Sequence, residues 1–206
     1  MDREHKDVLA YVEVSDGKPV NVGLELLTCA RSIADGAGGK VLAVLIGSGL
    51  DAAVKKVAAS GVDRVIVVTD PAYTAFRQDE YTSVLERLIR RYEPAVVLTG
   101  NTPLSIGLAP RLAARFQSGC VADVTSVRRE NGRLTWVTTR YCGTVLANEV
   151  ITNSALQFAT VRPGSFSKPE AAKTAAPVEK ISVAVPADAV RTKIRDTVQK
   201  ISETVN

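Results

Sequence analysis

Four runs of mainly apolar residues constrain the fold of this chain more than any other feature of its sequence. Each run is short and ends at a turn rich in glycine, proline or small polar residues. The runs cover residues 8–14, 41–46, 65–68 and 95–98. A strand that is apolar on both faces is typical of a parallel sheet, because helices cover both sides of such a sheet. The runs therefore predict four strands of a parallel sheet.

The segments between these runs carry apolar residues at helical spacing, which predicts amphipathic helices. The predicted helices cover residues 22–34, 50–60, 80–92 and 105–116. Strands that alternate with helices are joined by right-handed crossovers. The fold class is therefore predicted to be α/β, with a parallel doubly wound sheet.

The second half of the chain is predicted to be a β-rich extension. Residues 119–127 alternate like a strand, and residues 134–138 are expected to pair back on them across the hairpin turn Asn131-Gly132. Two more short strands are predicted at 144–150 and 155–161. With this extension, residues 1–164 are expected to form one domain.

The remaining residues divide into a linker and a terminal unit. Residues 165–179 are rich in Ala, Pro, Lys and Ser without periodicity, which is typical of a linker. Residues 180–206 are predicted to form an edge-like strand and then a helix. The predicted helix carries an apolar stripe of Val190, Ile194, Val198, Ile201 and Val205.

The composition excludes several classes of protein. A net charge of +4 with scattered Lys and Arg and only 5% aromatic residues offers no stacking platform, so no nucleic-acid partner is expected. One histidine and three distant cysteines provide neither a zinc site nor a disulfide framework. No apolar run approaches the length of a membrane span, and the charged first residues do not resemble a signal peptide. A cytoplasmic protein without a bound metal is therefore expected.

Sequence motifs for catalysis are also missing. The chain has no GxxxxGK[ST] phosphate loop, no GxGxxG after the first predicted strand and no GxSxG nucleophile turn. We therefore expect that this chain is not an enzyme by itself.

Two glycine-containing turns are candidates for binding a nucleotide phosphate. One contains Gly47 and follows the second predicted strand; the other contains Gly100, Asn101 and Thr102 and follows the fourth. Both could present backbone N–H groups to an anion beside a helix N-terminus. In the alternative interpretation, glycine permits a tight turn and Thr102 or Ser105 caps the next helix.

Two arginines on the helix after this turn form a second polar feature. Arg111 and Arg115 lie four residues apart and share one helical face. They could recognise an acidic partner or a phosphate, or they could simply be solvated.

An ordered set of motifs carries a resemblance to a known family. The motifs are Thr99-Gly100, Leu108-Ala109-Pro110-Arg111-Leu112-Ala113-Ala114-Arg115, Gly119 with Ala122-Asp123-Val124, Arg140-Tyr141 with Gly143, and Ala159-Thr160-Val161-Arg162-Pro163-Gly164-Ser165-Phe166. Together they closely resemble the amino-terminal domain of the electron transfer flavoprotein alpha subunit. The resemblance covers residues 5–185 and is weaker in the first half. The chain departs from the family pattern at residues 140–143, 148–149, 156 and 158.

The resemblance implies a sheet like that of the adenine nucleotide alpha hydrolases and a role in electron transfer. In that family the alpha subunit pairs with a beta subunit, and the heterodimer carries electrons between dehydrogenases and acceptors such as a quinone reductase. FAD is implied in the intact heterodimer. The family's FAD-binding motifs belong to a carboxyl-terminal domain that would follow Asn206, so none is expected on this chain alone. The chain is then expected to be a scaffold and an interface.

The resemblance also implies positions for the site. Arg140, Tyr141 and Arg162 are expected to face the flavin or the partner subunit. A different class of function remains open, namely a free-standing adenine-nucleotide-binding or signalling module that uses the turns at Gly47 and Gly100.

Overall fold

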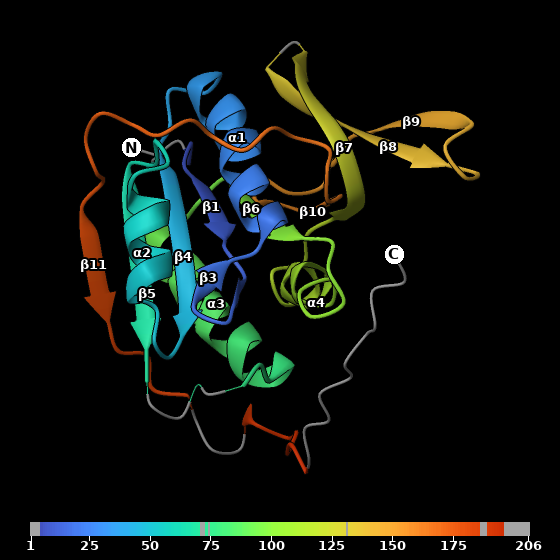
Figure 1. Ribbon diagram of the computed structural model, residues 1–206. Coiled ribbons are helices and arrows are strands. Elements are labelled where there is room, and N and C mark those ends of the chain that lie inside the picture. The colour runs from blue at the N-terminus through green and yellow to red at the C-terminus, as the bar shows by residue number, and fades with distance from the viewer. Residues whose placement is uncertain (1–4, 71–72, 74, 131, 186–188, 196–206) are drawn as a thin grey trace, which may run out of the picture.

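A computed structural model describes residues 5–70, 73, 75–130, 132–185 and 189–195 of the chain. Most of the described strands join one nine-stranded sheet, in the order β11-β5-β4-β1-β6-β10-β7-β8-β9 (Figure 1). In that order the strands are Val178–Ile181, Arg64–Thr69, Val41–Gly47, Val8–Tyr11, Val96–Gly100, Gln157–Val161, Cys120–Glu130, Arg133–Arg140 and Val145–Glu149. All neighbours from β11 to β7 pair in parallel, whereas β8 and β9 add antiparallel. The predicted α/β class with a mainly parallel sheet is confirmed.

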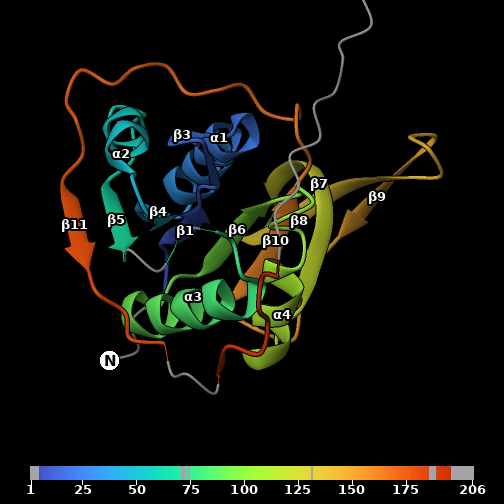
Figure 2. The ribbon, with the colours of Figure 1, turned by 60° about the horizontal axis from the view of Figure 1, so that its bottom comes forward.

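Helices cover both faces of the parallel part of the sheet. The helices are α1 (Asn21–Asp35), α2 (Asp51–Ala58), α3 (Gln78–Tyr92) and α4 (Leu108–Arg115). Figure 2 shows α1 and α2 on one face and α3 and α4 on the other. In β1, Val8 and Ala10 belong to the core under α1, and Leu9 and Tyr11 belong to the core over α3. Because side chains alternate along a strand, two covered faces require an apolar residue at every position.

Two predicted elements have different bounds in the structure. The first run does not stay in one strand, because Val14–Ser15 (β2) pairs with Lys18–Pro19 (β3) in a separate small hairpin. The helix predicted from residue 105 begins at Leu108, because the residues before it form a hydrogen-bonded turn.

The β-rich half contains the predicted hairpin and both further strands, but they lie in different places. β7 and β8 form the antiparallel hairpin, and β8 and β9 continue it as an arm that projects from the body of the molecule (Figures 1 and 2). β10 instead inserts between β6 and β7, in parallel with both. Phe158, Ala159 and Val161 are fully buried there, as expected for a central strand rather than for part of an extension.

The terminal unit differs from its prediction. The edge strand lies at Val178–Ile181, so it begins within the predicted linker and pairs with β5. Residues 190–195 contain no helix, which contradicts the start of the predicted terminal helix, and residues 196–206 lie outside the described part of the chain. Arg191 and Thr192 lie beside the carboxylate of Asp79 on α3 and help to keep its pKa below its usual value. The described part of this segment therefore lies against α3 instead of forming a helix of its own.

Candidate functional site

The ends of β6 and β10 bring two predicted site segments together. In the parallel pair, Val161 lies beside Gly100, so the turn after β6 meets the residues that follow β10. The backbone N–H of Asn101 donates to the carbonyl oxygen of Val161 at 2.8 Å. The carboxyl ends of parallel strands are where α/β proteins commonly place their sites. Asn101 and Arg162 were predicted from separate stretches of sequence, and the sheet joins them.

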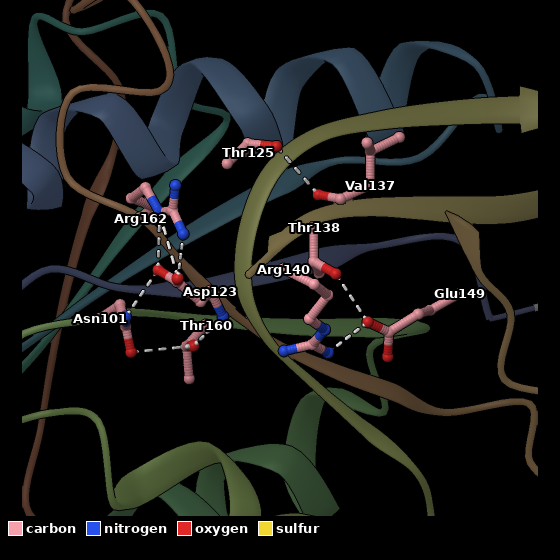
Figure 3. A network of polar contacts seen from close by, with 9 residues as sticks. All are labelled: Asn101, Asp123, Thr125, Val137, Thr138, Arg140, Glu149, Thr160 and Arg162. Carbon is pink, nitrogen blue, oxygen red and sulfur yellow. Dashed lines mark hydrogen bonds and ion pairs between the residues drawn. The ribbon is translucent and has the colours of Figure 1, made fainter. Parts of the chain in front are cut away.

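Asp123 is the centre of the polar network at this edge (Figure 3). It lies in an irregularity of β7, where the pairing register shifts, and its φ of 65° is left-handed. Its carboxylate accepts hydrogen bonds from Asn101 Nδ2 at 2.7 Å and from Arg162 Nε at 3.1 Å. Its backbone N–H donates to Thr160 Oγ1 at 2.8 Å. Three separate segments of chain therefore meet at Asp123, and an aspartate tolerates the left-handed conformation better than bulkier residues.

The network keeps Asp123 and Arg162 charged. The hydrogen bond from Arg162 is the main reason that the pKa of Asp123 lies below its usual value, and the charges of Arg162 and Arg140 and the amide of Asn101 act in the same direction. The same hydrogen bond raises the pKa of Arg162. The pair is therefore an ion pair at neutral pH.

We predict that Asp123→Asn destabilises the protein at neutral pH but not in acid. A lowered folded-state pKa means that the carboxylate stabilises the fold above the unfolded pKa, and this contribution is lost as the pH falls through the folded pKa. We expect the variant to lose about 1 kcal/mol at pH 7, because the pair is partly solvated.

Urea unfolding at pH 7 and pH 3 measures this difference, which should shrink on acidification. Glu170→Gln, in an exposed segment, is the control and should show little difference at either pH. A difference between Asp123→Asn and the native protein that stays constant with pH would contradict the prediction.

The turn after β6 uses its hydroxyl groups internally. Thr102 Oγ1 donates to Glu13 Oε2 at 2.5 Å and accepts from the backbone N–H of Ser105 at 3.0 Å, while Ser105 Oγ donates to the carbonyl oxygen of Gly100 at 2.8 Å. Neither side chain caps α4, which follows Gly107 without a side-chain cap, so the capping part of the alternative interpretation is wrong. The hydrogen bonds favour a structural turn, and anion binding by Gly100, Asn101 and Thr102 stays a prediction.

Two buried carboxylates also lie around this edge. Glu13 accepts from Thr102, and Glu25 on α1 accepts from the backbone N–H of Gly164 at 2.6 Å. Neither forms an ion pair with any described residue. Negative charge beside the turn disfavours a phosphate group at this place. Gly47 ends β4, which is separated from β6 by β1, so the two predicted glycine turns do not converge on one point of the edge.

The arm carries the other two predicted site residues. Arg140, at the end of β8, donates to Glu149 Oε1 at 2.5 Å, and Thr138 Oγ1 donates to the same oxygen at 2.7 Å (Figure 3). Tyr141 begins the turn into β9 in a left-handed conformation, and its side chain is 80% exposed. The charge of Arg140 also lowers the pKa of Asp123, so Arg140 lies near the network. Tyr141, in contrast, lies at the exposed tip of the arm.

The arm exposes an unusual amount of apolar side chain. Leu146 is 67% exposed, and Val145 and Val150 are each almost half exposed. β9 is the last strand of the sheet, so its outer edge pairs with no described strand.

Sequence reasoning missed Asp123, Thr160 and Glu149 as members of the site. The only available signal for Asp123 was an acidic residue inside an otherwise strand-like stretch that belonged to a family motif. Within the described residues there is no group of three or more side chains suited to hold a metal ion. Over the same residues, no helix combines the length and the apolar character that crossing a membrane requires.

Comparison with known proteins identifies the family. Residues 8–186 match the electron transfer flavoprotein domain. The chain is 33% identical over 205 residues to protein FixB of Clostridium saccharobutylicum and 32% identical over 205 residues to the electron transfer flavoprotein subunit alpha of Thermoanaerobacterium thermosaccharolyticum. In both cases 98% of this chain is aligned, with 61% and 62% of the relative, so the chain spans about three fifths of their length. It is also 34% identical over 167 residues to the lactate dehydrogenase (NAD(+),ferredoxin) subunit LctC of Acetobacterium woodii, covering 81% of this chain and 40% of that protein.

The aligned part is the amino-terminal domain portion of the alpha subunits. The motifs identified in the sequence and the α/β fold agree with this match. The chain belongs to the electron transfer flavoprotein family, as an amino-terminal domain of the alpha-subunit type.

Proposed function

We propose that this chain is the scaffold and the subunit interface of a heterodimeric, FAD-containing electron carrier, and that its partner is an electron transfer flavoprotein beta subunit. The observation that carries the proposal is the projecting arm of β8 and β9 with its exposed apolar side chains. Contiguous exposed apolar residues commonly mark protein–protein contacts. The relatives named as electron transfer flavoprotein subunits support the electron-transfer part.

The arm is suited to docking because its two strands have a defined structure, while its apolar side chains and the outer edge of β9 are uncovered. Glu149 holds Thr138 and Arg140 on one side of the arm, which stiffens the pair of strands. A two-stranded segment that projects from its sheet buries little apolar surface by itself. A partner that covered Tyr141 and Leu146 and lay along the open edge of β9 would bury this surface and satisfy the free backbone groups.

The flavin site is proposed to be completed by residues outside the described part of this chain. At the carboxyl edge of the sheet, Asn101 and Arg162 each direct donors to the carboxylate of Asp123, which restrains both side chains. The buried carboxylates of Glu13 and Glu25 lie where a pyrophosphate would need positive charge or free N–H groups. FAD is accordingly proposed for the heterodimer and not for this chain alone. Arg140 is proposed to contribute positive charge at the flavin-facing or partner-facing edge.

The proposed role is that of an electron-carrier subunit in the cytoplasm, not of a catalyst acting alone. In the complete complex, a dehydrogenase would supply the electrons, and a quinone reductase or a similar protein would accept them. This chain contributes shape and charge to the heterodimer.

The proposal is tested by mixing the full chain with the beta-type subunit encoded beside it and recording the size-exclusion profile and the flavin absorbance. We expect a stoichiometric complex. Leu146→Asp should weaken it by about tenfold or more, because a charge would replace an apolar contact at the interface. Val178→Asp is the matched control, since Val178 is a 43% exposed apolar residue on β11 at the far end of the sheet.

An unchanged affinity of Leu146→Asp, or an equal loss in Val178→Asp, would contradict the arm as the interface. A nucleotide bound to the lone chain, with no complex, would instead support the nucleotide-binding module.

A further inference from the structure

A groove with a volume of about 930 Å³ lies between α3 and α4, on the face of the sheet opposite α1 and α2. Its rim on one side is formed by Ala189, Arg191 and Thr192, and the last two lie beside Asp79. Five arginines line it, and they are Arg87, Arg90, Arg111, Arg115 and Arg191. We propose that this groove binds an acidic segment of a partner polypeptide. The proposal goes beyond the electron-carrier role and does not depend on it.

The groove has a surplus of positive charge. Among the described residues, Asp79 and Glu86 are its only acidic lining residues. Hydrogen bonds from arginines keep the pKa of both carboxyls below their usual values, so both are charged at neutral pH. Five guanidinium groups against two carboxylates leave three positive charges uncompensated.

The existing ion pairs leave much of the arginine surface available. Arg111 pairs with Asp79 at 2.6 Å, and Glu86 pairs with Arg115 at 2.5 Å and with Arg90 at 2.9 Å. A guanidinium group has five N–H donors, so each of these arginines keeps donors for a second acceptor. Arg90 is 60% exposed and stacks over the ring of Phe116 at 4.8 Å, which restrains its orientation. Arg87 forms no ion pair with any described residue.

The distribution of the charges favours an extended ligand. Arg87 and Arg90 lie about one turn apart on α3, as do Arg111 and Arg115 on α4, so the guanidinium groups form two rows along the groove. Glu86 already pairs with Arg90 and Arg115 across the two rows, so a carboxylate is an acceptor that these arginines bind. The described lining contains no aromatic residue on which a base could stack, which argues against single-stranded nucleic acid. A chain of glutamate or aspartate side chains fits both features.

The test uses a fluorescein-labelled decaglutamate peptide and the full-length chain in fluorescence anisotropy at low salt. We expect binding that weakens steeply as salt is added, because the charges are solvated. The double variant Arg87→Glu/Arg191→Glu should bind at least tenfold more weakly. Neither of these two arginines forms an ion pair between α3 and α4, so the fold should be retained, which circular dichroism checks.

The control is Lys168→Glu/Lys173→Glu, which changes the net charge equally at exposed positions outside the groove. It should bind within twofold of the native chain, as should Leu146→Asp in the arm. The proposal is overturned if the native chain does not bind the peptide, or if the control loses as much affinity. It is also overturned if inorganic phosphate or single-stranded RNA competes as well as unlabelled peptide.

Discussion

Replacing Trp136 by alanine is expected to lower the free energy of unfolding by about 3–5 kcal/mol, the usual cost of truncating a fully buried aromatic side chain. Trp136 in β8 is completely buried in the core that also contains α1. Its indole Nε1–H donates to Gln157 Oε1 at 2.9 Å, at the start of β10. The substitution therefore leaves a cavity and also removes the bond that joins the hairpin to a central strand.

Urea unfolding followed by circular dichroism measures this loss, because Trp136 is the only tryptophan and its fluorescence disappears with it. Tyr141→Ala, on the exposed tip of the same hairpin arm, is the control and should change stability by less than about 0.5 kcal/mol. A loss below about 1 kcal/mol for Trp136→Ala would mean that the hairpin does not pack on α1 as described. The pair of variants also separates folding, which needs Trp136, from the proposed docking, which needs the arm's surface.

The second large effect is expected at Gly39, before β4. A Cβ atom there would lie 2.0 Å from the carbonyl oxygen of Lys6 and 3.1 Å from the backbone nitrogen of Asp7. That backbone cannot easily move away, because the N–H of Val8 donates to the carbonyl of Lys40 and the N–H of Lys40 donates to the side chain of Asp7, both at 2.8 Å. We expect Gly39→Ala to cost about 3 kcal/mol or more, as overpacking against backbone does.

Gly38→Ala is the matched control, because Gly38 has a φ of 67° and no atom within 4 Å of an added Cβ. Alanine there carries only the cost of a left-handed conformation, about 1 kcal/mol. Thermal and urea unfolding of the two variants compares them directly. If Gly39→Ala lowered the free energy of unfolding as little as Gly38→Ala does, the backbone before β1 would not lie as close to Gly39 as the structure shows.

The site was only partly predictable. The resemblance to the family pointed to Arg140, Tyr141 and Arg162, and the structure places both arginines near one carboxylate. It did not point to Asp123 as the centre, because that role follows from a register shift in β7 and from the close approach of β6 and β10. Of the five arginines that line the groove, only Arg111 and Arg115 were predicted from the sequence as a possible recognition feature. The other members come from α3 and from the segment after β11, and no sequence spacing relates these elements.

The terminal segment shows that helical spacing of apolar residues does not by itself establish a helix. The apolar stripe from Val190 predicts a helix, yet the described part of that segment is not helical and lies against α3 beside Asp79. A helical pattern states which side chains could share a face, but tertiary contacts compete for the same backbone groups.

The sequence by itself determined the local elements and the fold class. Side-chain periodicity and turn residues act over a few positions, so the main strands, the four helices and the β7–β8 hairpin could be predicted from the chain. Only the tertiary structure decided that β10 inserts between β6 and β7, that β11 returns to the far edge of the sheet, and that Asn101, Asp123 and Arg162 meet. These outcomes depend on pairing between strands that are distant in sequence. Such pairing is selected by the burial of whole faces and the satisfaction of backbone hydrogen bonds, and no local pattern encodes that choice.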